Sequence, residues 1–171
     1  AAAWAHNRRM SACSITRAPF GCAPDGRPVE RVTLTNTRGT TLRVLSWGAI
    51  VQSLEVADAS GRCDDVVLGY DAIEPYHVNR GYLGAVVGRY ANRIAGARFT
   101  LDGADLQLAA NNGANALHGG LEGFDRRNWR IVAIEDGAQP AVTLAYTSPD
   151  GEEGYPGTLE VEVTWRLAGP M

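Results

Sequence analysis

Apolar and polar residues alternate along most of this 171-residue chain with the two-residue period of a β-strand. In the clearest stretch, over residues 159–167, leucine, valine and tryptophan alternate with glutamate, threonine and arginine. Neighbouring side chains of a strand point to opposite faces of the sheet, so this stretch is predicted to form a strand with one apolar and one charged face. The same period predicts earlier strands around residues 32–34, 42–44 and 50–56.

Turn residues indicate how some strands are joined. Asp102-Gly103 separates residues 98–101 from residues 104–108, and an Asp-Gly pair supplies the positive φ angles that a two-residue hairpin turn needs. The Asp136-Gly137 pair lies between two further segments with alternating apolar residues, which predicts a second hairpin.

The remaining pattern also indicates a β protein. A short buried strand is predicted over residues 66–68, an apolar triplet that follows two aspartates and precedes Gly69. We find no segment of twelve residues with a helical period. Many short strands between glycine-rich turns are typical of an all-β sandwich or barrel. Residues 71–81 and 109–128 lack a strand pattern, and loops of such length in a compact domain are often functional.

The composition is that of an ordinary globular protein. Apolar residues make up 45% and charged residues 20%, which argues against disorder, and the length fits one domain or a large part of one. The formal net charge is −3, and the 16 basic residues, all arginine, are scattered. We therefore expect no nucleic-acid partner, because such proteins usually have a basic face or tract. No apolar stretch approaches the length that crosses a bilayer, so no membrane partner is expected.

Several other chemistries find no support. The three cysteines, at positions 13, 22 and 63, form no C-x-x-C motif, which favours reduced thiols in a cytoplasmic protein. His6, His77 and His118 are too dispersed to indicate a metal site. We find no phosphate-binding loop, no H-E-x-x-H motif and no serine nucleophile elbow.

The segment GRYANRI, at residues 88–94, is the first candidate for ligand binding. If it forms a strand, Arg89, Ala91 and Arg93 lie on one side, and a guanidinium held there could donate to oxygen acceptors such as sugar hydroxyls. The alternative, which the spacing alone favours, is an arginine that faces solvent or pairs with a local carboxylate.

The second candidate is His118, which is followed by two glycines. Glycines let the backbone turn sharply and leave room for a ligand beside the imidazole, which titrates near neutral pH. The alternative is a loop histidine with a structural hydrogen bond.

Two weaker candidates complete the set. Glu152 and Glu153 could act as an acid and a base, but a connection rich in proline and glycine is the better interpretation of residues 148–157. Aromatic rings can stack on sugars, yet core packing is the safer interpretation for four of the five prominent rings, with Phe124 as the exception because it lies in the long loop. The other four are Trp47, Phe99, Trp129 and Trp165.

Taken in order, these motifs resemble the aldose 1-epimerase (galactose mutarotase) family over nearly all of the chain after about Phe20. The matching motifs are FG..PDG at residues 20–26, LTN at 34–36, WGA at 47–49, DDVVLGYD at 64–71, GRYANRI at 88–94, F.LDG at 99–103, N.G.N.LHGG..GFD at 111–125 and SPDGEEGYPG at 148–157. Each motif alone is weak, but the ordered set is highly specific.

The resemblance implies a large antiparallel β-sandwich that interconverts the α and β anomers of aldohexoses such as galactose and glucose, without a metal or a cofactor. It implies that Asn92 and Arg93 contact sugar hydroxyls and that His118 lies beside the sugar ring, with His118 and Arg93 as catalytic residues. Family members are about twice this length, so residues 19–171 are expected to be the N-terminal half of the sandwich, incomplete at the C-terminus. Residues 1–18 are expected to be a disordered or non-native extension.

The resemblance also implies that the family's general acid, a second histidine, and its general base, a glutamate, lie beyond Met171. Ring opening requires one group to protonate the ring oxygen and another to take the proton of the C1 hydroxyl. His118 alone cannot do both, so the chain by itself is expected to be inactive, with the missing C-terminal half as its partner. A non-catalytic sugar-binding sandwich, or a purely structural module, remains the alternative.

A half sandwich would leave apolar sheet surface and strand edges uncovered. We therefore expect the apolar face of residues 159–167 to be exposed, and the isolated chain to be poorly soluble, partly unfolded or self-associated.

Overall fold

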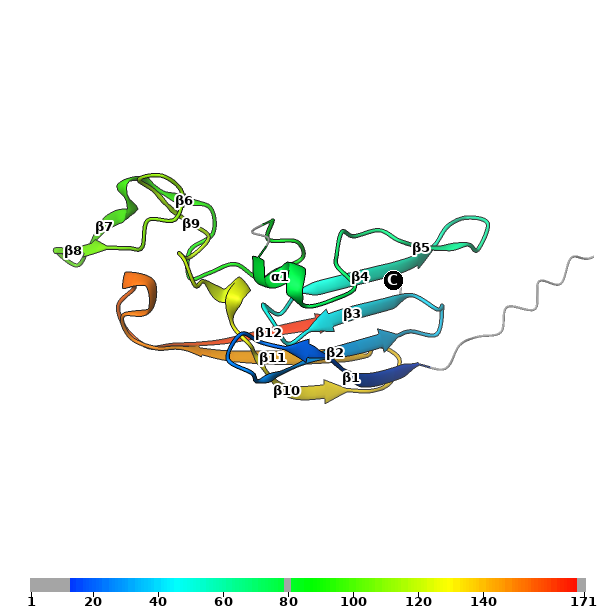
Figure 1. Ribbon diagram of the computed structural model, residues 1–171. Coiled ribbons are helices and arrows are strands. Elements are labelled where there is room, and N and C mark those ends of the chain that lie inside the picture. Colours follow the sequence, from blue (N-terminus) through cyan, green and yellow to red (C-terminus); the bar gives the residue numbers. More distant parts are fainter. Residues whose placement is uncertain (1–12, 79–80, 169–171) are drawn as a thin grey trace, which may run out of the picture.

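The computed structural model describes residues 13–78 and 81–168, in which two antiparallel sheets are stacked on each other (Figure 1). The first sheet has five strands in chain order: β1 (Ser14–Cys22), β2 (Pro28–Thr35), β3 (Thr41–Leu45), β4 (Val51–Ala57) and β5 (Cys63–Asp65). The second sheet has three: β10 (Arg130–Glu135), β11 (Ala141–Ser148) and β12 (Leu159–Arg166). The all-β antiparallel sandwich that the alternation and the resemblance predict is therefore confirmed.

Alternating apolar residues of the two sheets meet in one core. Val44 of β3 and Val142 and Leu144 of β11 are fully buried in the same cluster, together with residues of β2. Burying each of these side chains contributes about 1.5–3 kcal/mol, which explains why the two-residue period is so clear in these strands.

Between the sheets in sequence, residues 66–129 carry only small elements. They are α1 (Glu74–Val78), β6 (Arg93–Ile94), η1 (Ala95–Ala97), β7 (Arg98–Leu101), β8 (Ala104–Gln107), β9 (Ala116–Leu117) and η2 (Phe124–Arg126). The β7–β8 hairpin and the β6–β9 pair lie beyond one end of the sandwich, beside the connection from β11 to β12, which contains η3 (Glu152–Gly154) (Figure 1).

The N-terminal strand extends further than expected. Strand β1 pairs with β2 from Ser14 opposite Thr35 to Cys22 opposite Pro28, so the boundary expected at residue 18 falls inside β1. Only a few of its side chains are half-buried, among them Ile15, and the sequence therefore shows no clear alternation there. Residues 1–12 lie outside the described residues.

The buried strand predicted over residues 66–68 is wrong. Strand β5 comes earlier, at Cys63–Asp65, and the side chains that follow it are open, with Val66 59% and Leu68 76% exposed. Strand β5 lies at the edge of its sheet and pairs with β4 alone. An apolar triplet indicates burial only if something packs over it, and within the described residues these two side chains remain exposed.

The expected exposure of the last strand is also only partly correct. Val161, Val163 and Trp165 of β12 are half-buried against the core, and the indole of Trp165 donates to the carbonyl oxygen of Ala49 at 3.2 Å. Leu159, at the start of the strand, is 41% exposed.

Phe124 corrects another expectation. Its ring is buried against Trp129 and Tyr146, with ring centroids 5.7 Å apart in both pairs, so it belongs to the core and is not a stacking platform. The core placement predicted for Trp47, Phe99, Trp129 and Trp165 is confirmed, because each packs in or against a buried cluster.

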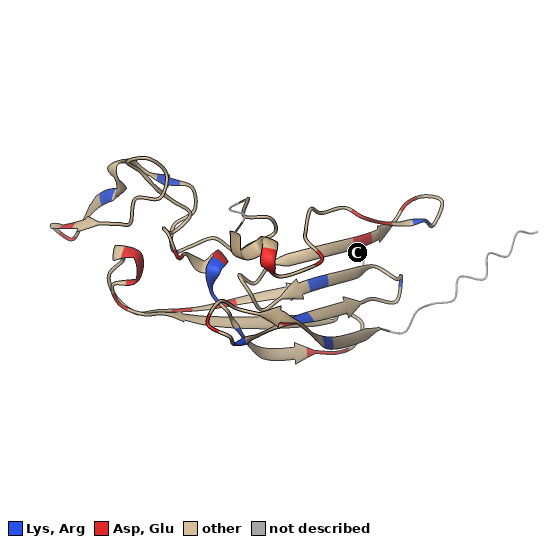
Figure 2. Ribbon diagram, viewed as in Figure 1, with Lys and Arg blue, Asp and Glu red and all other residues tan. Residues whose placement is uncertain are grey.

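Acidic and basic residues are interspersed over both sheets and their connections (Figure 2). Many form ion pairs, such as that of Arg17 with Glu30 at 2.6 Å. Among residues 13–78 and 81–168, no helix is both long and apolar enough to span a membrane.

Candidate active site

The fold brings Asn92 and His118 together from two separate segments. The short strands β6 and β9 pair with Arg93 opposite Leu117, which places the GRYANRI segment beside the histidine loop. The His118 backbone N–H donates to the carbonyl oxygen of Asn92 at 3.0 Å, and the Asn92 backbone N–H donates to Nδ1 of His118 at 3.0 Å. This reciprocal pair fixes the imidazole relative to Asn92.

Arg93 lies in the same group and is exposed. Its Nε donates to Oδ1 of Asn112 at 3.0 Å, and its Nη1 donates to Oδ1 of Asn92 at 3.2 Å. The two amide oxygens hold the guanidinium at the surface without neutralising its charge. The candidate site thus combines an amide, a cation and an imidazole on an accessible face.

The backbone at this site is held in unusual conformations. Asn92 and His118 both have positive φ angles, 64° and 51°, a region that asparagine and histidine visit more often than most residues. The ring of Tyr82 meets the imidazole edge to face, with centroids 4.6 Å apart. Such strained positions commonly occur at functional sites.

The surroundings of His118 favour its neutral form. Desolvation, and then the charge of Arg93, lower the pKa of His118 below its ordinary value of 6.5. Since Nδ1 accepts a hydrogen bond from the Asn92 N–H, the neutral ring carries its proton on Nε2. Near neutral pH, His118 therefore offers an Nε2–H donor.

The glycines after His118 serve a different purpose from the one expected. A Cβ atom on Gly119 would lie 1.5 Å from the carbonyl oxygen of Gly88, and one on Gly120 would lie 2.1 Å from Oε2 of Glu153. At these two glycines the adjoining space is therefore occupied by protein atoms. The glycines allow the histidine loop to pack directly against its two neighbours.

Arg89 neither faces a ligand from a strand nor pairs with a carboxylate, the two possibilities that the sequence offered. Only Arg93 and Ile94 of that segment form a strand, and the Arg89 side chain leaves it to hold the connection from β11 to β12. Its five N–H groups make five hydrogen bonds of 2.7–3.0 Å, to the hydroxyl and carbonyl of Ser148 and to the carbonyls of Pro149, Pro156 and Gly157.

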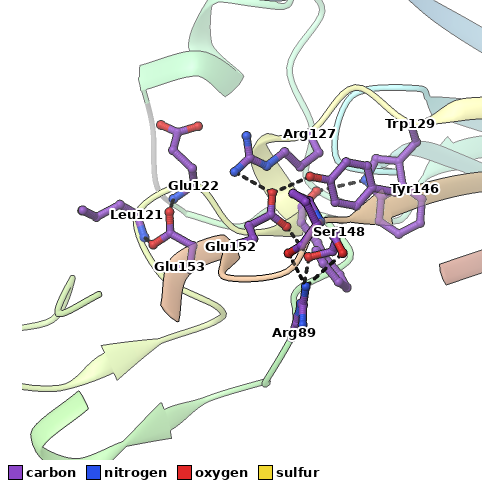
Figure 3. Close-up of polar contacts among 11 residues, drawn as sticks. Arg89, Leu121, Glu122, Arg127, Trp129, Tyr146, Ser148, Glu152 and Glu153 are labelled. Atoms are coloured by element: carbon purple, nitrogen blue, oxygen red, sulfur yellow. Dashed lines mark hydrogen bonds and ion pairs between the residues drawn. The ribbon is translucent and has the colours of Figure 1, made fainter. Parts of the chain in front are cut away.

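Glu152 anchors the same connection from within. Its carboxylate is 9% exposed and accepts from Arg127 at 2.9 Å, from the hydroxyl of Tyr146 at 2.5 Å and from that of Ser148 (Figure 3). Desolvation, and then the bond to Glu152, raise the pKa of Tyr146 to about 12. Glu152 is thus a buried structural anion.

Glu153 points to different partners. Its carboxylate accepts the backbone N–H of Leu121 at 2.7 Å and that of Glu122 at 3.0 Å (Figure 3). The prediction that residues 148–157 form a connection is confirmed by the position of η3 between β11 and β12. The two glutamates bind protein groups, so they are not arranged as an acid and base pair facing a shared ligand.

The three predicted residues Asn92, Arg93 and His118 lie together, but the residues that support them were not predicted. Asn111 is one: its side chain binds the backbone of Leu117 and the carbonyl of Gly120 at 2.6–2.8 Å. Side chains that hold loops follow no period. The available signal was the concentration of asparagine and glycine in residues 109–128, which indicates a loop stabilised from within.

The other histidines do not join this group. His77 packs against Trp47, with ring centroids 5.1 Å apart, and burial lowers its pKa; His6 lies outside the described residues. In the described part of the chain, no group of three histidine, cysteine or acidic residues is placed to hold a metal ion.

Comparison with known proteins agrees with this arrangement. Residues 30–170 match the model of the family described as aldose 1-epimerase. The chain is 48% identical to the galactose mutarotase of Bos taurus over 157 residues, which are 91% of this chain and 44% of that protein. It is 42% identical to the aldose 1-epimerase of Escherichia coli (strain K12) over 145 residues, 85% of this chain and 41% of the other.

A solved structure shows the same relationship. The galactose 1-epimerase from Lactobacillus acidophilus NCFM superposes with a TM-score of 0.79 at 27% identity, covering 91% of this chain and 45% of that one. The present chain therefore spans less than half the length of these relatives. The matched residues 30–170 include strands β3 to β12 and the Asn92–His118 group, and the chain belongs to the aldose 1-epimerase family.

Proposed function

We propose that this chain supplies the sugar-binding portion of an aldose 1-epimerase, an isomerase that interconverts the α and β anomers of aldohexoses such as galactose and glucose. The observation that carries the proposal is the grouping of Asn92, Arg93 and His118 on one accessible face, held by hydrogen bonds among their own atoms. We further expect a cytoplasmic protein, since its three cysteines are unpaired.

The chemistry of the three side chains suits a sugar. Arg93 presents fixed N–H donors beside an amide, and neutral His118 presents an Nε2–H donor. Hydroxyl and ring oxygens of an aldohexose accept from such groups without requiring a metal. In this role Asn92 and Arg93 orient the ring, while His118 donates to an oxygen near the reacting carbon.

Anomer exchange also needs proton transfer at two atoms. The ring oxygen gains a proton as the C1 hydroxyl loses one, and the bond between C1 and the ring oxygen breaks to give the open-chain aldehyde. The C1–C2 bond then rotates, and the freed hydroxyl adds to the other face of C1, losing its proton as the aldehyde oxygen gains one. Asn92 and Arg93 cannot carry protons near pH 7, and His118 can serve only one of the two atoms. We propose that the general acid and the general base both lie in the part of the relatives that this chain does not span.

Polarimetry with freshly dissolved α-galactose tests the proposal. For the 171-residue chain alone we expect the rotation to decay at the buffer rate, while NMR signals of Asn92 and His118 shift on addition of galactose. For a version extended past Met171 to the length of the relatives, we expect faster decay, which His118→Ala reduces roughly 10²–10⁴-fold. Arg62→Ala, at an exposed ion pair near β5, is the control and should leave the rate unchanged.

The alternative is a sugar-binding sandwich without catalysis. It predicts the same NMR shifts but buffer-rate decay even for the extended version. If the isolated chain makes the rotation decay much faster than the buffer rate, the proposal that the proton carriers lie outside this chain is refuted. Absence of any galactose-dependent shift contradicts sugar binding by this face.

A further inference from the structure

We propose that Glu153 is a positioning residue for the candidate site, holding the histidine loop in place through the backbone of residues 121 and 122. This inference deepens the proposed function and rests on it in one respect, the identification of Asn92 and His118 as the binding residues. Glu153 itself has no role in proton transfer in this proposal.

The first step is that the connection carrying Glu153 is a rigid platform. Arg89 joins four of its residues through five hydrogen bonds, and the buried Glu152 carboxylate ties it to Arg127 and Tyr146 (Figure 3). Tyr155 is buried in a small cluster with Ala116 of β9 and Leu108, the residue after β8. Glu153 therefore projects from a fixed base.

The second step is the contact that Glu153 makes. One carboxylate oxygen accepts the N–H of Leu121 and the other accepts the N–H of Glu122, so the anion spans two successive peptide groups. Hydrogen bonds to a charged acceptor are stronger than those between neutral groups. Gly120 provides the space, since a Cβ atom there would overlap the carboxylate.

The third step links this contact to the imidazole. Leu121 follows His118 by three residues, and Gly119 between them packs directly on the carbonyl of Gly88. The N-terminal side of the loop is held by the side chain of Asn111 and by the two hydrogen bonds between Asn92 and His118. Glu153 restrains the opposite side of the loop, so the His118 backbone, strained at a φ of 51°, is fixed from both directions.

The platform also reaches both halves of the site. Arg89 belongs to the segment that carries Asn92, and Glu153 binds the segment that carries His118. The connection from β11 to β12 thus bridges the two segments. Sequence alone does not show this, because residues 89 and 153 are far apart in the chain.

NMR of the uniformly ¹⁵N-labelled chain tests the inference through the backbone amide signals, the Nδ1 signal of His118 and the pH titration of His118. Glu153→Gln replaces one acceptor with an N–H₂ donor at nearly the same shape. We expect the signals of residues 121 and 122 to move, the Nδ1 signal to lose the signature of an accepted hydrogen bond, and the His118 midpoint to rise toward 6.5. The dissociation constant for galactose should rise roughly tenfold.

The direction of the titration change separates positioning from charge. Removing a negative charge would by itself lower the His118 midpoint, whereas release from the Asn92 hydrogen bond and better hydration raise it. Glu153→Asp keeps the charge but withdraws the carboxylate by one methylene, and we expect the same upward change. Glu160→Gln, which removes an exposed carboxylate on β12 that accepts from Thr147, is the matched control and should leave His118 unchanged.

The outcomes are distinct. Unchanged His118 signals in Glu153→Gln and Glu153→Asp, or a lowered midpoint in Glu153→Gln alone, overturn the positioning role. Changed His118 signals support that role even if the wild-type chain binds no galactose, and in that case only the proposed function fails. Signals of β11, which lies outside the loop, report whether each variant is folded.

Discussion

Arg93 lies close enough to His118 for its charge to influence the protonation of the imidazole. Burial and the Arg93 charge both disfavour the imidazolium, while the Asn92 N–H occupies the nitrogen that protonation would use. Protonation must break that hydrogen bond or place two donors against each other. The site is therefore expected to bind sugar through the neutral ring and to lose affinity as the pH falls.

Arg93→Gln should raise the pKa of His118, because it removes a nearby positive charge and keeps a side chain of similar length. Histidine NMR titration measures this directly. His77 is an internal control: its pKa is lowered by burial, and its charged neighbours are Glu74 and Arg126, so its midpoint should not change. A lowered or unchanged His118 midpoint would contradict this account.

The lowered pKa of His118 also makes the folding stability depend on pH. A folded-state pKa below the unfolded value of 6.5 means that the unfolded chain binds more protons in that range. The contribution of His118 to folding stability is present above about pH 6.5 and is lost as the pH falls through the folded value. Arg93→Gln should make this part of the pH profile shallower, which denaturation at several pH values would detect.

Arg89→Lys should destabilise the chain, because an ammonium group cannot replace five N–H groups that point at separate acceptors. Ser148 is fully buried, so its carbonyl would lose its partner where water cannot reach it. We expect a loss of about 2–4 kcal/mol in urea denaturation. The control is Arg166→Lys at an exposed ion pair on β12, which should change stability by at most about 0.5 kcal/mol.

Among the secondary-structure elements, the β7–β8 hairpin is the one that the sequence predicts most directly. Leu101 pairs with Ala104 across Asp102 and Gly103, whose φ angles are 51° and 80°. These are the positive angles expected of an Asp-Gly hairpin turn. The prediction succeeds because the turn depends on local backbone conformation alone.

Gly103→Ala should therefore destabilise the hairpin by about 1 kcal/mol, since an added Cβ meets no atom within 4 Å and only the φ angle is strained. Hydrogen exchange of the β7 and β8 amides should increase, with little change in β11. Asp102→Asn, which also tolerates positive φ, is the control. Equal protection in the alanine variant would contradict a turn governed by backbone strain.

Burial is harder to predict from the sequence where it depends on segments that lie far away along the chain. The apolar triplet at 66–68 has the composition of a buried strand, yet Val66 and Leu68 are exposed beside the edge strand β5. Likewise, Phe124 lies in a loop but fills the core. In both cases the outcome depends on which other element packs there, and alternation within a segment carries no such information.

For the whole molecule, the described residues leave strand edges and apolar side chains uncovered. Strands β5 and β12 end their sheets, and Val66, Leu68 and Leu159 are 41–76% exposed. Exposed edges with apolar side chains favour association between chains. The half-buried face of β12 reduces this surface below what we expected from the sequence.

We expect the isolated chain to self-associate, with a sedimentation coefficient that rises with concentration. Val66→Lys combined with Leu68→Lys should reduce this association, because charge on an edge disfavours pairing. The matched control is Leu101→Lys in the β7–β8 hairpin, an exposed leucine away from that edge. A monomer with a sharp, concentration-independent melting transition would contradict the prediction.

At the same scale, the three residues predicted for the site lie together in the fold, whereas the residues that hold them in place were not predicted. The resemblance implied Asn92, Arg93 and His118, and the fold places them together. Arg89, Glu152 and Glu153 were not recognised as supports, because their partners are backbone groups and side chains brought close only by the fold. Such contacts leave no periodic trace in the sequence.

The main-chain contact between Gly88 and Gly119 has one further consequence. At this contact the two backbones lie directly against each other, so there is no room for a side chain at Gly119. A methyl group at Gly119 would force the two segments apart, whereas one at Gly88 would overlap the ring of Phe124. Under the proposed sugar-binding role, we expect changes in preference among hexoses to come from substitutions at the rim of the Asn92–His118 face and not from this contact.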